Sequence, residues 1–238
     1  MLVPKSSSAA GATLVAAVFL STSVSAATGP YAKAPLDRYM TASRQSEVDL
    51  ARSAAPPSIS SRATVLVLTS HGYVVTAKGT NGFTCLVERA WMSPFDSIEF
   101  WNWHMHGPIC YNPPASRTVL QYTLARTNLV LSGLNKSQIL ERVQAEAAAG
   151  SLPSPEPGSM SYMMSKHGFL GDGVGSWYSH LMIYTPKGES ANDGASWGAD
   201  LAGSPVAFDN GHRVVPEPET IMMVIVPRWS DGTAAPKP

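Results

Sequence analysis

The sequence predicts a single α+β domain in which helices pack on a mainly antiparallel sheet of about six strands, with long loops. Three strand-like runs come first along the 238-residue chain, two helical segments follow, and three more strand-like runs come last. Strands and helices that are grouped rather than alternating are typical of α+β folds. Short turns within the first group favour antiparallel neighbours, because a parallel pair needs a crossover of about a dozen residues or more.

The composition is that of a globular protein with many turns. Apolar residues make up 44% of the chain, and glycine and proline contribute 19 residues each. Only 14% of the residues are charged, which is below the usual share of about 25%. The 17 basic and 17 acidic residues balance, so no broad positive field is available to attract nucleic acid or an anionic membrane. We therefore expect no nucleic-acid partner.

Residues 1–26 have the pattern of a secretory signal peptide. Lys5 supplies a basic start, an apolar run follows from 10 to 20, and Val24-Ser25-Ala26 resembles the small-residue cleavage site of such peptides. The apolar run is shorter than the roughly 20 residues that span a bilayer. We expect a mature chain that begins near Ala27, lies in the periplasm or outside the cell, and contains no membrane span.

The region 27–59 is predicted to be an N-terminal leader followed by a helix. Good or neutral helix formers run from Leu36 to Ser53, and Pro56-Pro57 ends them, because proline disfavours helical geometry in the residue before it. The α+β domain is expected to occupy 60–228, followed by a disordered tail over 229–238.

Three strands are predicted to form a meander at the start of the domain. The β-branched run Ala63–Leu68 is followed by a return over Tyr73–Ala77, and Asn81-Gly82 then precedes the alternating run 84–89. Asn-Gly is the dipeptide most typical of a type I′ hairpin turn, because both of its residues tolerate positive φ. The pattern predicts an antiparallel hairpin at Asn81-Gly82.

Cys85 and Cys110 are the two cysteines of the chain. In an exported protein such a pair is expected to form a disulfide, and no C-x-x-C spacing points to redox activity. A crosslink over this span stabilises a fold by about 3 kcal/mol in the chain-entropy account. The segment 90–115, rich in tryptophan and histidine, is predicted to be a long loop that its rings and the disulfide hold down.

Two helices are predicted in the middle of the chain. Leucines at helical spacing indicate one over 118–131. Asn135 and Gln138 form a capping box at the start of the next, and Gly150 lies where a helix commonly ends. Strands are then expected over three segments, with a Gly- and Ser-rich excursion over 187–209 anchored by Trp197; the strand segments are Met160–Ser165, His180–Tyr184 and Thr220–Val226.

Four segments together resemble a group of exported bacterial proteins with no assigned activity. They are Thr80–Arg89 (TNGFTCLVER), Gly107–Tyr111 (GPICY), Ser161–Ser165 (SYMMS) and His180–Met182 (HLM). The resemblance covers roughly 60–228, and it implies no catalytic residue, cofactor or substrate.

Two sets of side chains are candidates for a site on the sheet. Glu88, Tyr162 and His180 form an acid and base set if their strands bring them together. Strand alternation predicts that Met164 shares a face with Tyr162, and that Met182 and Tyr184 share a face with His180. Methionines on neighbouring strands are typical of adaptable binding surfaces. The structural alternatives are core packing for the methionines and an ion pair between Glu88 and Arg89 at the strand end.

His104 and His106 are weaker candidates for a metal site. In an extended segment both imidazoles point to the same side, but a zinc site needs at least a third ligand. The third would have to come from the other histidines, at 71, 167, 180 or 212. We expect neither a metal nor a cofactor, and interpret both residues as loop histidines packed beside tryptophans.

The favoured functional hypothesis is a non-enzymatic exported domain that binds a small apolar ligand or a protein partner. The chain contains no G-x-S-x-G elbow, H-E-x-x-H pair or phosphate-binding glycine loop. A hydrolase-like enzyme that uses Glu88, His180 and Tyr162 is the alternative. A periplasmic metal binder through His104 and His106 is the third hypothesis.

Overall fold

The computed structural model describes residues 30–172, 175, 177–188, 198–199, 201–208 and 214–236. The predicted signal peptide, residues 1–26, lies outside these ranges. So do His212 and the predicted anchor Trp197, together with most of the excursion that contains Trp197.

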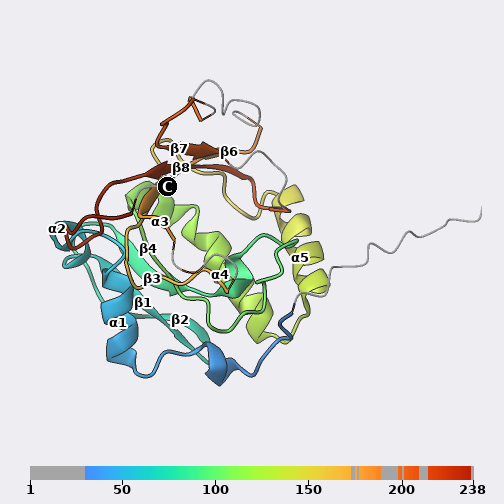
Figure 1. Ribbon diagram of the computed structural model, residues 1–238. Coiled ribbons are helices and arrows are strands. Elements are labelled where there is room, and N and C mark those ends of the chain that lie inside the picture. The colour runs from blue at the N-terminus through green and yellow to red at the C-terminus, as the bar shows by residue number, and fades with distance from the viewer. Residues whose placement is uncertain are drawn as a thin grey trace, which may run out of the picture.

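The described residues form one α+β unit built on a sheet of eight strands, in the order β2-β1-β3-β4-β5-β6-β8-β7 (Figure 1). The strands are β1 (Thr64–Thr69), β2 (Gly72–Ala77), β3 (Thr84–Glu88), β4 (Gly107–Tyr111), β5 (Met160–Met163), β6 (His180–Pro186), β7 (Val206–Phe208) and β8 (Glu219–Ile225). All neighbours are antiparallel except β1 and β3. The predicted fold class is therefore confirmed, with β4 and β7 as additional strands.

The helices pack on both faces of this sheet. They are the 3₁₀ helices η1 (Leu36–Tyr39) and η2 (Ala90–Met92), and the α-helices α1 (Arg44–Arg52), α2 (Pro57–Ser60), α3 (Pro113–Arg117), α4 (Leu120–Leu131) and α5 (Lys136–Ala148). The capping box predicted for α5 is present, since Asn135 and Gln138 each accept from the backbone of the other. None of the described helices has the length and apolar character needed to cross a membrane.

The predicted hairpin at Asn81-Gly82 is wrong. Gly82 has φ of +78°, but Asn81 does not share its positive φ, and a type I′ turn needs both. The Asn81 side chain instead donates to the carbonyl of Ile59 (2.8 Å) and accepts from the Phe83 amide (3.1 Å). These contacts hold the chain in a crossover that brings β3 to the far side of β1.

That crossover makes β1 and β3 parallel, so the three strands are not a meander. It runs against the start of β1, where the Thr80 amide donates to the Arg62 carbonyl (2.8 Å). A Cβ at Gly79 would lie 2.2 Å from the Thr64 nitrogen. Only glycine allows so close an approach of two backbones.

Strand β4 occupies part of the segment predicted to be a loop. Its sequence Gly107-Pro108-Ile109-Cys110-Tyr111 contains two residues that are depleted in strands. Tertiary pairing overrides this preference, because β4 lies between β3 and β5 and all five residues are buried.

The two faces of the sheet are covered differently. On β3, Cys85 and Val87 belong to the cluster beneath α1, whereas Leu86 belongs to the larger cluster on the opposite face. The predicted disulfide between Cys85 and Cys110 is present, and it joins directly opposed residues of β3 and β4 on the α1 face.

The opposite face of the sheet curves around α4. Figure 1 shows β1 to β4 on one side of α4 and β6, β7 and β8 on the other. Because strands β3 to β6 and β8 also contribute to the cavity described below, the curvature sets the shape of the candidate site.

Both ends of the described chain pack against the domain rather than extending from it. Within the region expected to be a leader and helix, Val48 and Ala51 are buried in the core. Residues 229–236, expected to be part of a disordered tail, also contact the domain. The Ser230 hydroxyl donates to the Ser53 carbonyl (2.6 Å), and Lys166 pairs with Asp231 (2.6 Å).

A buried ion pair fixes α1 to the end of β3. The Arg89 guanidinium lies 2.9 Å from the Glu47 carboxylate and also donates to the Tyr39 carbonyl (2.6 Å). The same Glu47 oxygen accepts from the Leu68 amide of β1 (3.0 Å). The structure thus pairs Arg89 with a residue of α1 and not with Glu88.

We predict that Glu47→Ala lowers the free energy of unfolding by about 3 to 5 kcal/mol, because it leaves a buried guanidinium without its partner. Urea denaturation followed by circular dichroism measures the loss. Glu156→Ala is the matched control. It breaks the exposed pair with Arg117, whose side chains are 60% and 40% accessible, and should cost less than about 1 kcal/mol.

Equal losses in the two variants would contradict the structural role assigned to the Glu47 pair.

Candidate functional site

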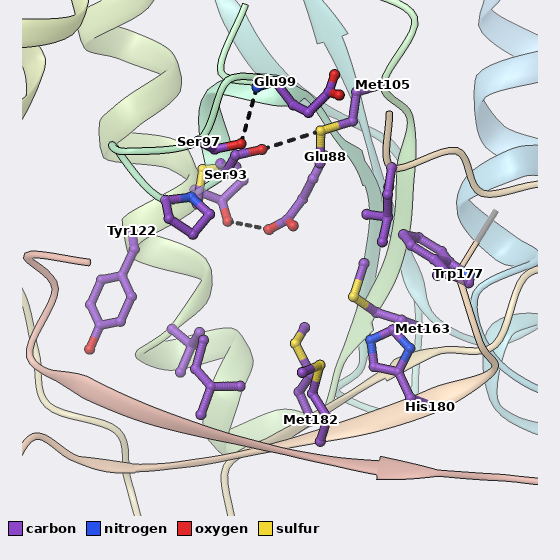
Figure 2. Close-up of a pocket in the computed structure, with 18 of the residues that line it drawn as sticks. Glu88, Ser93, Ser97, Glu99, Met105, Tyr122, Met163, Trp177, His180 and Met182 are labelled. Atoms are coloured by element: carbon purple, nitrogen blue, oxygen red, sulfur yellow. Dashed lines mark hydrogen bonds between the residues drawn. The ribbon is translucent and has the colours of Figure 1, made fainter. Parts of the chain in front are cut away.

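A cavity of about 640 Å³ lies between the curved face of the sheet and α4. Its walls are contributed by β3, β4, β5, β6 and β8, by α4 and by the segment that follows η2. Figure 2 shows these side chains converging on one space. Among the described residues of the lining are five of the ten methionines of the chain: Met92, Met105, Met163, Met182 and Met223.

Alternate side chains of the adjacent strands β6 and β8 form one wall of the cavity. His180, Met182 and Tyr184 line the cavity from β6. In the antiparallel register Met182 lies opposite Met223 and Tyr184 opposite Ile221, so β8 presents these partners to the same space. The shared face of His180, Met182 and Tyr184 therefore forms part of the lining.

The structure does not bring Tyr162 to Glu88 and His180. In the register of β5 and β6, Met163 pairs with His180 and Tyr162 pairs with Leu181. Met163 therefore lines the cavity, while Tyr162 packs near Phe83 on the α1 face of the sheet, with 6.2 Å between ring centroids.

Met164, the other candidate on this segment, is also outside the lining. It follows the last residue of β5, and its amide donates to the Ala54 carbonyl (2.9 Å).

Glu88 brings a buried carboxyl group to the cavity. Its Oε1 accepts from the Tyr111 hydroxyl (2.6 Å) and from the Thr123 hydroxyl (2.8 Å). Burial raises the pKa of Glu88, although the two hydrogen bonds and the charge of Arg126 oppose this shift. Within the described chain Oε2 has no hydrogen-bond partner, so this oxygen is available to a ligand.

Glu219, at the start of β8, is a second acid in the lining. Its Oε2 is buried and has no hydrogen-bond partner among the described residues. Burial raises the pKa of Glu219 well above its ordinary value, and the neighbouring charge of Glu217 adds to the shift.

Glu217, two residues earlier, has the opposite environment. The Arg126 guanidinium binds both of its carboxylate oxygens, at 2.5 and 2.7 Å. Arg126 also donates to the carbonyls of Trp91 (3.1 Å) and Ser93 (2.8 Å). The hydrogen-bonding capacity of Arg126 is thus directed at Glu217 and at the backbone.

His180 presents a neutral ring to the cavity. Its Nδ1 lies 2.6 Å from the Tyr178 carbonyl, so Nδ1 carries the proton and donates it. Burial lowers the pKa of His180, and the ring packs edge-on against Trp177. Nε2 is then an acceptor without a protein donor in the described part of the chain.

The main side-chain donors of the lining are already used within the protein. Tyr111 and Thr123 donate to Glu88, as described above. The Tyr122 hydroxyl donates to the Pro153 carbonyl, and the Trp177 indole donates to the Ser165 carbonyl (2.9 Å). The cavity thus offers free acceptors on Glu88, Glu219 and His180 but few free donors.

His104 and His106 do not form a recognisable metal centre in the described residues. The Nδ1 of His106 lies 2.7 Å from the His104 carbonyl, and the His104 ring packs against Trp103 in a tilted arrangement, with 3.4 Å between ring centroids. Among the described residues, no group of three or more His, Cys, Asp or Glu side chains is placed to hold a metal ion.

Met163 and Glu219 line the cavity but are not among the site residues predicted from the sequence. For Met163 the missing information was the register of β5 against β6, since either face of a short strand can be the buried one. For Glu219 a signal was available. It alternates with Ile221 and Met223 in a strand-like run, which places an acid on the same face as two apolar residues.

No family model, curated protein or solved structure matches the chain.

We predict opposite stability effects for two neighbouring substitutions. Glu219→Gln should stabilise the protein at neutral pH. The raised pKa of Glu219 means that its ionisation destabilises the fold as pH rises above the ordinary glutamate pKa. Glu217→Gln should destabilise it by about 3 to 5 kcal/mol, because it weakens the buried pair with Arg126. Thermal and urea unfolding at several pH values measure both effects.

The advantage of Glu219→Gln should vanish in acid, where the wild-type carboxyl is protonated in both folded and unfolded chains. A loss of stability in Glu219→Gln at neutral pH would contradict its unpaired state.

Proposed function

We propose that this domain binds a small, mainly apolar molecule in the cavity between the sheet and α4. The observation that supports the proposal is the cavity itself, whose volume of about 640 Å³ lies within the range of about 300 to 1,000 Å³ that is usual for small-molecule sites. Its lining also has the usual composition of such sites, with many apolar side chains and a few convergent polar groups.

The methionines support binding over simple core packing. A thioether side chain is flexible and polarisable, so it adapts to ligands of irregular shape. Met182 and Met223 line the cavity, whereas Met222, next to Met223 on β8, is fully buried outside it. The same strand therefore carries one methionine toward the cavity and one into the packed interior.

Acid and base catalysis by Glu88 and His180 is a second candidate function. Burial raises the pKa of Glu88 and lowers that of His180, and such shifts are common among catalytic acids and bases. Tyr162, the third member of the expected set, lies on the other face of the sheet. Recovery of a bound ligand unchanged after incubation would favour binding, and its conversion would favour catalysis.

We also propose that the protein functions outside the cytoplasm. The signal-like pattern of residues 1–26 and the disulfide between Cys85 and Cys110 support this location.

A fluorescent apolar probe tests the cavity directly. We predict that N-phenyl-1-naphthylamine binds to the wild-type protein with increased fluorescence, and that Met182→Trp abolishes the increase because the larger ring fills the space. Val75→Trp is the matched control. It adds the same ring on β2, where Val75 is 53% exposed and lies outside the lining, and should leave probe binding unchanged.

Wild-type fluorescence that stays at the level of free probe would contradict the proposed function. Equal probe binding by wild type and Met182→Trp would show that the probe binds elsewhere.

Two methionine-to-alanine variants test whether Met182 lines a cavity or belongs to the packed core. We predict that Met222→Ala lowers the free energy of unfolding by about 2 to 5 kcal/mol, as expected for a fully buried methionine. Met182→Ala should cost much less, since Met182 already borders a cavity, and it should change the retention of the probe. Urea unfolding of both variants measures the difference, and comparable losses would indicate that Met182 is ordinary core.

A further inference from the structure

The charged groups that line the cavity all have one sign. The acids in its described lining are Glu88, Asp96, Glu99 and Glu219, and no lysine or arginine is among the described lining residues. The cations whose charge acts on Glu88 or Glu219 lie outside the described lining and are engaged elsewhere. Arg126 binds Glu217 and two carbonyls, and Lys187 donates to the Val215 carbonyl (2.8 Å).

Three acceptor atoms of the described lining are free. Glu88 Oε2, Glu219 Oε2 and His180 Nε2 have no protein donor in the described structure. Figure 2 shows Glu88 and His180 reaching into the same space, with Met163 and Met182 along the wall. A ligand that fits this space offers a donor to one or more of these acceptors and an apolar surface to the rest of the wall.

We infer that the ligand is an apolar amine, bound as its ammonium ion with the charged group against Glu88 and the hydrocarbon body against the methionines of β5, β6 and β8. This inference rests on the proposed binding function and adds the chemical class of the ligand. An ammonium group supplies three donors and places a positive charge inside the cavity, where the described lining has none.

The same arrangement selects against anions. A fatty acid or a phosphate ester would place a second negative charge beside Glu88 and Glu219, and it would find no free cation in the described lining. Unpaired like charges in a buried site are a common means of rejecting the wrong ligand.

Three probes of matched chain length and different charge test the ligand class. Decylamine, decanol and decanoate are titrated against the wild-type protein loaded with N-phenyl-1-naphthylamine, and displacement is followed by fluorescence. We expect decylamine to displace the probe at a concentration at least roughly tenfold below that of decanol, the margin expected for a hydrogen bond to a charged group. Decanoate should be the weakest competitor.

Variants identify the carboxyl groups responsible. Glu88→Gln keeps an oxygen that can accept from Tyr111 and Thr123 but removes the charge, so the amine and the alcohol should become equal competitors. Glu219→Gln should reduce the preference for the amine by a smaller factor and provides a second measurement if Glu88→Gln does not fold. Glu156→Gln, on the surface and outside the lining, should leave the preference unchanged.

The outcomes separate this inference from the proposed function. Equal displacement by amine and alcohol, stronger displacement by decanoate, or an amine preference that persists in both cavity variants would overturn the assignment of an amine while leaving a binding cavity. Absence of probe binding by the wild-type protein would overturn the proposed function as well.

Discussion

The cavity depends on the buried ion pair between Arg126 and Glu217. Through this one guanidinium, α4 is joined to the chain that enters β8 and to the carbonyls of Trp91 and Ser93. The pair therefore ties together three of the segments that surround the cavity. It also directs the guanidinium at Glu217, so that Glu219, two residues away, keeps a buried Oε2 without a hydrogen-bond partner among the described residues. The architecture and the negative character of the site thus have a common origin.

The two faces of the sheet have different roles, because one is closely packed and the other borders the cavity. On the α1 face, small and β-branched side chains pack around the disulfide of Cys85 and Cys110, and Arg89 pairs with Glu47. On the α4 face, larger and more adaptable side chains surround a cavity. Because successive residues of a strand point to opposite faces, β3 contributes Cys85 to the first role and Glu88 to the second.

The elements encoded by local signals were predictable, and the pairings between distant segments were not. The capping box at Asn135 identified α5, and alternation identified β6 and β8. The hairpin predicted from the Asn81-Gly82 dipeptide is wrong, because the contact with Ile59 and the close approach of Gly79 to β1 favour a crossover. The strand registers place Glu88 and His180 beside the same cavity and Tyr162 on the other face of the sheet. These registers depend on tertiary packing between distant segments, which local sequence patterns do not encode.

The contact between Ser230 and Ser53 has a consequence for the order in which the fold is completed. These residues are 177 positions apart, and Ser230 also bonds to the Met164 carbonyl beside β5. A chain that emerges from a ribosome or a translocation pore with its N-terminal part first cannot form this contact until residue 230 has emerged. Helix α1 therefore reaches its final packing only at that stage, and a chain that has emerged to a shorter length leaves Ser53 and the end of β5 without this cover.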